Sequence, residues 1–97
     1  MSDTRFDGRW RQVRPDPAPA RILLTFDSDG ALTYVIAMDG GTQTFALRWR
    51  VENETLISTN EHGEESASRF RFASPAMLVL ERPAENAAER HVYRREE

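Results

Sequence analysis

The feature that most constrains this chain is a strict alternation of apolar and other residues in several short segments. Phe45, Leu47, Trp49 and Val51 alternate with threonine, alanine and arginine. Successive side chains of a β-strand point to opposite faces, so this pattern predicts a strand with one buried and one exposed face. Such strands are typical of antiparallel sheets, because strands of parallel sheets are usually buried on both faces.

Turn sequences separate these alternating segments. DSDG (27–30) lies between the alternating stretches 22–26 and 32–38, with aspartates at the turn corners and a glycine that accepts positive φ, so we expect a β-hairpin here. Similar breaks follow at MDGGTQ (38–43), ENE (52–54) and EHGE (61–64).

Counting DGRWRQV (7–13) as the first strand and HVYRR (91–95) as part of the last, the chain contains about eight short strands of about five to nine residues. The proline-rich PDPAPA (15–20) predicts a rigid, extended connection, and PAENAAE (83–89) a loop or one helical turn. We therefore expect an all-β fold in which residues 1–97 form a single domain. Its most economical form is a small antiparallel meander or up-and-down β-barrel.

Composition excludes several classes of protein. The 97 residues are 39% hydrophobic, which is enough for one core. The absence of cysteine excludes a disulfide framework and a thiolate metal site. The first twenty residues hold no secretory apolar run, and no apolar stretch approaches the roughly 20 residues of a membrane helix. We therefore expect a cytoplasmic protein with no membrane partner.

The charges are unusual in that all thirteen basic residues are arginine. The net charge is −3 and acids are interleaved with the arginines, which counts against a nucleic-acid partner. Alternation places four arginines on the exposed face of their strands: Arg48, Arg50, Arg69 and Arg71. They form either a basic stripe that contacts phosphate or an acidic partner, or a solvated face. The second interpretation is favoured, since glutamates at positions 52, 54 and 65 can neutralise them.

Two histidines are the only candidates for metal or acid–base chemistry. His62 lies in a turn beside Glu61, Glu64 and Glu65, but a turn tip splays its side chains, so a solvated tip is favoured over a metal site. His91 shares a face with Tyr93, yet no nucleophile can be assigned to it. We expect no cofactor, no metal and no enzymatic activity.

The inward faces also carry polar residues. Ser66 and Ser68 share a face with Phe70, and Gln43 shares one with Phe45. A buried polar group without a partner costs about 1–3 kcal/mol, so such residues imply mutual hydrogen bonds, water or a ligand. The candidate ligand-binding residues are Trp10, Tyr34, Gln43, Trp49, Ser68 and Phe70. An ordinary core with polar residues at the strand ends explains the same set.

Gly8-Arg9-Trp10 at the start of the first strand, followed by TFDSDGALTY and TLIST, resembles the lipocalin and calycin superfamily, and most closely the short bacterial lipocalin-like domains of unassigned function. The resemblance implies a barrel with the tryptophan closing one end. It also implies that an arginine of the last strand, here Arg94 or Arg95, packs across the indole by a cation–π contact. Gly8, Trp10 and one of these arginines would then form the structural closure.

Two functions remain open. The first is non-catalytic binding of a small apolar or amphipathic ligand, or of a peptide segment, in or at the mouth of the barrel. The second is a protein-interaction module, a filled barrel that pairs through an edge strand or its outer face, with a homodimer as one form. A cavity above about 300 Å³ would favour the first.

Overall fold

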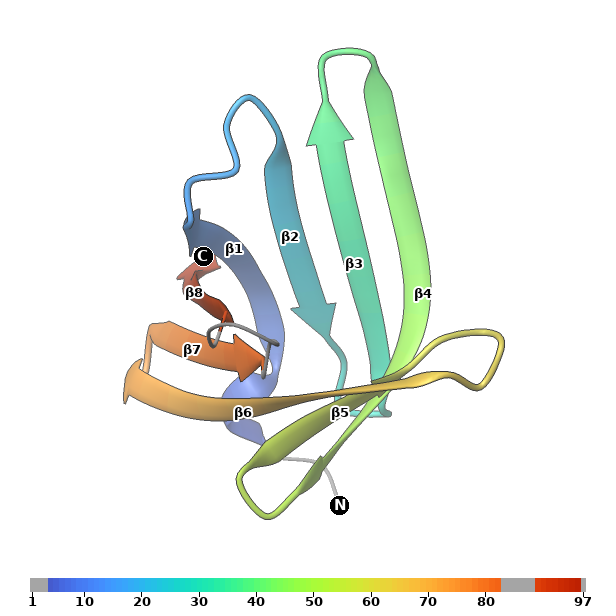
Figure 1. Cartoon of the computed structure of the whole chain (residues 1–97), viewed down its shortest axis with the longest axis vertical. Helices are drawn as coiled ribbons and strands as arrows, with labels where there is room; N and C mark the ends of the chain where they lie inside the picture. The colour runs from blue at the N-terminus through green and yellow to red at the C-terminus, as the bar shows by residue number, and fades with distance from the viewer. Residues whose placement is uncertain (1–3, 83–88, 97) are drawn as a thin grey trace.

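The computed structural model describes residues 4–82 and 89–96, which form a closed barrel of eight antiparallel strands in sequence order (Figure 1). The strands are β1 (Gly8–Arg14), β2 (Arg21–Phe26), β3 (Ala31–Met38), β4 (Gly41–Glu52), β5 (Thr55–Thr59), β6 (Glu65–Ser74), β7 (Met77–Arg82) and β8 (Glu89–Glu96). A 3₁₀ helix, η1 (Thr4–Phe6), precedes them.

The expected all-β up-and-down barrel is confirmed. Each strand pairs with the next, and β8 pairs with β1. This closure removes the edge strand on which the edge-pairing alternative depends, because an edge offers unpaired backbone groups to a partner. Residues 83–88, where a loop or helical turn is expected, lie outside the described part of the chain.

The DSDG hairpin forms where the sequence predicts it. The Gly30 amide donates to the Asp27 carbonyl at 3.0 Å, and Gly30 has a φ of 94°. Two side chains of β4 donate hydrogen bonds to backbone carbonyls of this turn. Arg48 Nη2 donates to the Asp29 carbonyl at 2.8 Å, and Trp49 Nε1 donates to the Asp27 carbonyl at 3.1 Å.

Two expectations about strands and connections are wrong. β4 spans twelve residues and β6 ten, beyond the expected maximum of nine, and the β3–β4 hairpin extends past its neighbours (Figure 1). The proline-rich connection is a compact turn, since the Ala20 amide donates to the Pro17 carbonyl at 2.9 Å. Asp16 stabilises this turn by accepting the Ala18 amide through Oδ1 at 2.9 Å.

The core lies inside the barrel and consists of the alternating apolar residues. Its strand members, each at most 5% exposed, are Trp10, Leu24, Phe26, Leu32, Trp49, Leu56, Leu78 and Tyr93. Burial of a large apolar side chain contributes about 1.5–3 kcal/mol, so this set is the main source of stability.

Phe6 fills one end of the barrel. Its side chain is 0% exposed, and its ring centroid lies 5.1 Å from that of Phe26 and 5.4 Å from that of Trp49. The rings of Phe70 and Phe72 lie at 4.9 and 5.0 Å. The alternation in the sequence does not predict η1, which positions this ring in the barrel. The end of the barrel near η1 is therefore closed by tightly packed aromatic side chains.

Trp10 and Arg95 complete this closed end. The Arg95 guanidinium carbon lies 4.3 Å from the centroid of the Trp10 ring, so Arg95, not Arg94, occupies the position that the resemblance implies. Its Nη1 and Nη2 donate to the carbonyls of Asp7 and Arg5 at 2.6 and 2.7 Å. The indole Nε1 of Trp10 donates to the Phe6 carbonyl at 2.8 Å.

Gly8 has a specific role in this arrangement. Its φ is 115°, a conformation that L residues rarely adopt, and a Cβ placed there would lie 3.0 Å from Arg95 Nη1. The glycine of the Gly-x-Trp sequence thus allows both the backbone bend and the close approach of the guanidinium.

We expect Arg95→Met to lower the free energy of unfolding by about 2 kcal/mol, because the cation–π contact and the hydrogen bonds to two backbone carbonyls are lost together. Arg94→Met is the matched control. Arg94 is exposed on the outer face, so its loss should change stability by less than about 0.5 kcal/mol. Urea denaturation measures both. Equal losses would contradict the role assigned to Arg95.

Candidate ligand-binding site at the barrel mouth

The end of the barrel opposite Phe6 is open and holds a cleft of about 380 Å³. Its lining residues come from β3 to β7 and are Tyr34, Ile36, Phe45, Leu47, Ser58, Asn60, Glu64, Ser66 and Arg82. The β3 and β4 members are apolar or aromatic, whereas the others are polar. The cleft therefore has one apolar wall and one polar wall.

The strand register explains why these side chains converge. Tyr34 lies directly opposite Phe45, and Leu32 directly opposite Leu47. Residues that oppose each other across paired strands point to the same face. Leu32 is buried in the core, so the whole set faces the barrel interior.

Phe45 is the most exposed aromatic residue of this wall. Its side chain is 46% exposed although it lies on the inner face of β4. Its ring centroid is 6.0 Å from that of Tyr34, with an interplanar angle of 53°. Phe45 lies in the half of β4 that belongs to the β3–β4 hairpin, and this hairpin extends past its neighbours (Figure 1).

A smaller cavity of about 30 Å³ lies deeper, lined by Ser68, Leu80, Arg82, His91 and Tyr93. This volume accommodates about two water molecules. Tyr93 is 4% exposed, and its hydroxyl makes no hydrogen bond to a described residue. Burial raises the pKa of Tyr93 above its ordinary value, and the neighbouring Tyr34 adds to this effect, whereas Arg82 opposes it.

Arg82 borders both the cleft and the smaller cavity. Within residues 4–82 and 89–96 it makes no ion pair or hydrogen bond through its side chain. Arg50 on the outer face differs, since Glu52 and Glu65 bind it at 2.6 and 2.8 Å. These hydrogen bonds raise the pKa of Arg50 and lower that of Glu65. Arg82 is thus the cationic side chain among the residues that line the mouth.

The structure separates the six predicted ligand-binding residues. Tyr34 lines the cleft and Ser68 the smaller cavity. Trp10, Trp49 and Phe70 pack in the closed end. Gln43 is exposed farther out on the β3–β4 hairpin, where it lines a separate cleft of about 390 Å³. Contact of any of the six with a ligand stays a prediction.

Sequence reasoning missed Phe45, Ser58 and Arg82 as members of the mouth. The alternation of side-chain direction along each strand places all three residues on the inward face. Arg82 is two residues after Leu80 and Ser58 two after Leu56, so each shares the inward face of its strand. This alternation does not show how far along the barrel axis each residue lies.

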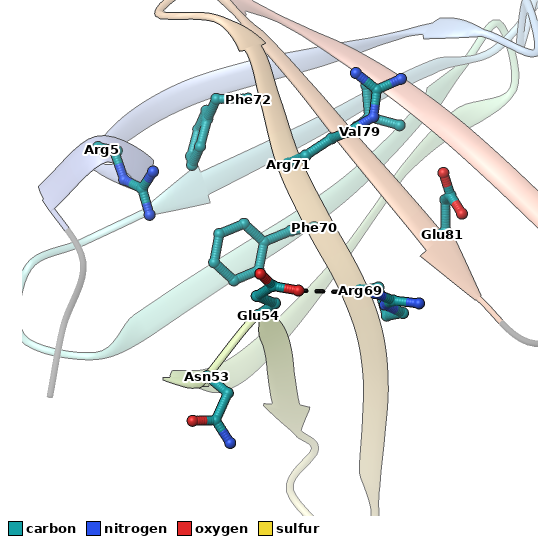
Figure 2. Close-up of a pocket in the computed structure, with 9 residues that line it drawn as sticks. All are labelled: Arg5, Asn53, Glu54, Arg69, Phe70, Arg71, Phe72, Val79 and Glu81. Atoms are coloured by element: carbon teal, nitrogen blue, oxygen red, sulfur yellow. Dashed lines mark ion pairs between the residues drawn. The ribbon is translucent and has the colours of Figure 1, made fainter.

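A further cleft, of about 420 Å³, lies over β6 beside η1. Figure 2 shows that it straddles the strand: Phe70 and Phe72 lie on the side of Arg5, and Arg71 and Val79 on the other. The guanidinium carbon of Arg5 is 4.8 Å from the centroid of the Phe72 ring. The inner half is therefore occupied by packed side chains, and the mouth is the better candidate for a small ligand.

The described residues offer little for metal chemistry. His62 is exposed at the β5–β6 turn, with Nε2 3.6 Å from Glu61 Oε1. Residues 4–82 and 89–96 contain no group of three or more histidine, aspartate or glutamate side chains placed to hold a metal ion.

Searches against known protein families and against curated protein sequences find no match to this chain. In the part of the chain that the structure describes, no helix is both long and apolar enough to cross a bilayer.

The buried Tyr93 predicts a pH dependence of stability. Because its pKa is raised in the folded state, its contribution is fully present below the ordinary tyrosine pKa of 10 and is lost as the pH rises above it. We expect the free energy of unfolding to fall by about 1 kcal/mol more between pH 10 and pH 11 in the parent protein than in Tyr93→Phe. Urea denaturation at the two pH values measures this difference, and identical slopes would show that Tyr93 titrates normally.

Proposed function

We propose that the mouth of the barrel binds one small amphipathic molecule without transforming it. The observation that carries this proposal is the half-exposed Phe45, which faces Tyr34 on one side of a cleft of about 380 Å³ whose other side is polar. This volume lies within the range of about 300–1,000 Å³ that small-molecule sites occupy.

The apolar wall would take the hydrophobic part of the ligand. Covering the exposed surface of a phenylalanine ring contributes about 1–2 kcal/mol, since half of the side chain is already buried. Leu47 and Ile36 extend the same wall. Such a surface favours an aliphatic or aromatic group over a fully polar molecule.

The polar wall would take the head group. Arg82 supplies a cation, and Ser58 and Ser66 supply hydroxyl groups that face the same cleft. An acidic head group suits this arrangement, because a guanidinium binds carboxylate, sulfonate or phosphate oxygens with two parallel hydrogen bonds. The rings packed around Phe6 fill the far end, so the ligand would lie near the mouth and be short.

The fold adds support of a more general kind. An eight-strand barrel closed by Trp10 and Arg95 has the features that a lipocalin-like domain implies. We propose on this basis that the chain is such a domain, with the reduced ligand space that its filled end leaves.

Binding of anilinonaphthalene sulfonate, an amphipathic anion that fluoresces in apolar surroundings, tests the proposal. We expect saturable binding to the parent and about tenfold weaker binding to Phe45→Ser, which removes the exposed ring. Met38→Ser is the matched control, because Met38 is 55% exposed on the same hairpin but does not line the cleft. Equal losses in the two variants would contradict binding at the mouth.

A second variant tests the head-group side. Arg82→Gln should weaken binding of the sulfonate by about fivefold or more and leave binding of the uncharged dye Nile red nearly unchanged. If both dyes lose affinity equally, Arg82 does not recognise the anionic group.

A further inference from the structure

The strand register gathers arginines on the outer face of β6, β7, β8 and β1, a surface distinct from the mouth. Seven arginines lie there: Arg9, Arg11, Arg14, Arg69, Arg71, Arg90 and Arg94. The surface in question covers β6 from Arg69 onward, together with β7, β8 and β1. The acidic residues on its outer side are Glu81 and Glu96. We call this surface the basic face. It is strongly cationic although the chain carries a net charge of −3.

At the centre of the basic face two like charges lie directly opposite each other. Arg11 of β1 pairs in register with Arg94 of β8, and both are exposed. Like charges at directly opposed positions of an antiparallel pair destabilise a sheet. Neither arginine forms an ion pair with a described residue. The sheet therefore carries a local repulsion that a bound anion would relieve.

Beside this pair, two valines of the basic face lie between arginines; Val79 is buried and Val92 is half-buried. Val79 of β7 and Val92 of β8 lie opposite each other, with Arg71 next to Val79 and Arg14 next to Val92. Val79 is only 3% exposed, and Figure 2 shows it on the same side of β6 as Arg71. The two flanking arginines stand on strands about 14 Å apart, three strand spacings. An extended peptide of about four residues covers this distance.

Neutralisation on the basic face is incomplete. Arg69 pairs with Glu54 at 3.7 Å and Arg90 with Glu81 at 3.2 Å. The other five arginines of the face form no ion pair with a described residue. They are Arg9, Arg11, Arg14, Arg71 and Arg94.

We propose that the basic face docks an acidic segment of a polypeptide. Guanidinium groups match carboxylates in geometry. The half-buried Val92 can contact an apolar side chain that lies between acidic ones. Single-stranded nucleic acid fits less well, because proteins that bind it stack bases on aromatic rings. The nine aromatic residues of the chain, five Phe, two Trp and two Tyr, lie in η1 or on inward strand positions. None is available on the basic face.

The basic face differs from the stripe of four arginines that the sequence suggests. Arg48 and Arg50 belong to β4, where the Asp29 carbonyl and two glutamates bind them. Arg69 and Arg71 instead share the basic face with arginines of β1 and β8, which sequence analysis did not connect with them.

Binding of a short synthetic peptide of glutamate and valine, measured by calorimetry at low ionic strength, tests this proposal. A peptide with glutamine in place of glutamate is the ligand control. We expect the acidic peptide alone to bind, and added salt to weaken it. Arg11→Gln/Arg94→Gln should lower its affinity about tenfold. The matched control Arg48→Gln/Arg50→Gln removes the same charge from β4 and should lower it less than threefold.

Thermal unfolding distinguishes a docking role from a structural one. Because Arg11 and Arg94 repel each other, their double variant should melt no lower than the parent while it loses peptide affinity. A lower Tm would assign the pair to stability and overturn the proposal. Equal affinity losses in the two double variants, the absence of saturable peptide binding, or tighter binding of an oligonucleotide or of anionic lipid vesicles would overturn it as well. None of these results bears on dye binding at the mouth. The peptide and dye experiments therefore test the two proposals independently.

Discussion

The contact of Arg95 with Trp10 and with the backbone before β1 is the interaction on which the barrel depends. The guanidinium binds carbonyls 88 and 90 positions earlier in the chain, and so ties the last strand to the segment that enters the first. The same segment carries Phe6, whose carbonyl accepts the indole Nε1 of Trp10. Closure of the barrel, burial of Trp10 and insertion of Phe6 therefore share the same few contacts, which local strand propensity alone does not produce.

This closure divides the interior into two ends with different chemistry. Near η1 the aromatic rings fill the barrel. The Trp10 indole and the Arg95 guanidinium there donate to backbone carbonyls, whereas the buried Asp7 Oδ1 accepts no hydrogen bond from a described residue. At the mouth, Ser58, Ser66, Arg82 and Tyr93 replace apolar residues on the inward positions of β5 to β8. Water reaches these groups, and a polar lining of this kind suits a ligand that carries polar atoms of its own. The position of the polar residues, more than the size of the cleft, places the candidate site at the mouth.

Alternation in the sequence predicts the barrel, the main turns and the face on which nearly every strand residue lies, because side-chain direction in a strand has a period of two. The pairing of Gly8 and Trp10 with a terminal arginine does not follow from alternation; the resemblance to lipocalin-like domains implies it. Alternation does not predict η1, since three residues around one phenylalanine carry no periodic signal. Nor does it give the depth of Trp49 or Gln43 within the barrel, which depends on strand length and on the stagger between β3, β4 and their neighbours.

The same periodicity relates the two proposed surfaces. Along β8, His91 and Tyr93 point into the barrel, while Arg90, Val92 and Arg94 point outward, so one strand serves the mouth and the basic face at once. On the inner face a substitution that packs badly lowers the stability of the barrel, so the residue type at these positions is strongly constrained. On the outer face Arg11 opposes Arg94, although one glutamate there would relieve the repulsion, as Glu52 and Glu65 do for Arg50. A repulsion that a single substitution could remove, left at the centre of a cationic surface, is the kind of local conflict that marks binding positions in otherwise self-consistent folds.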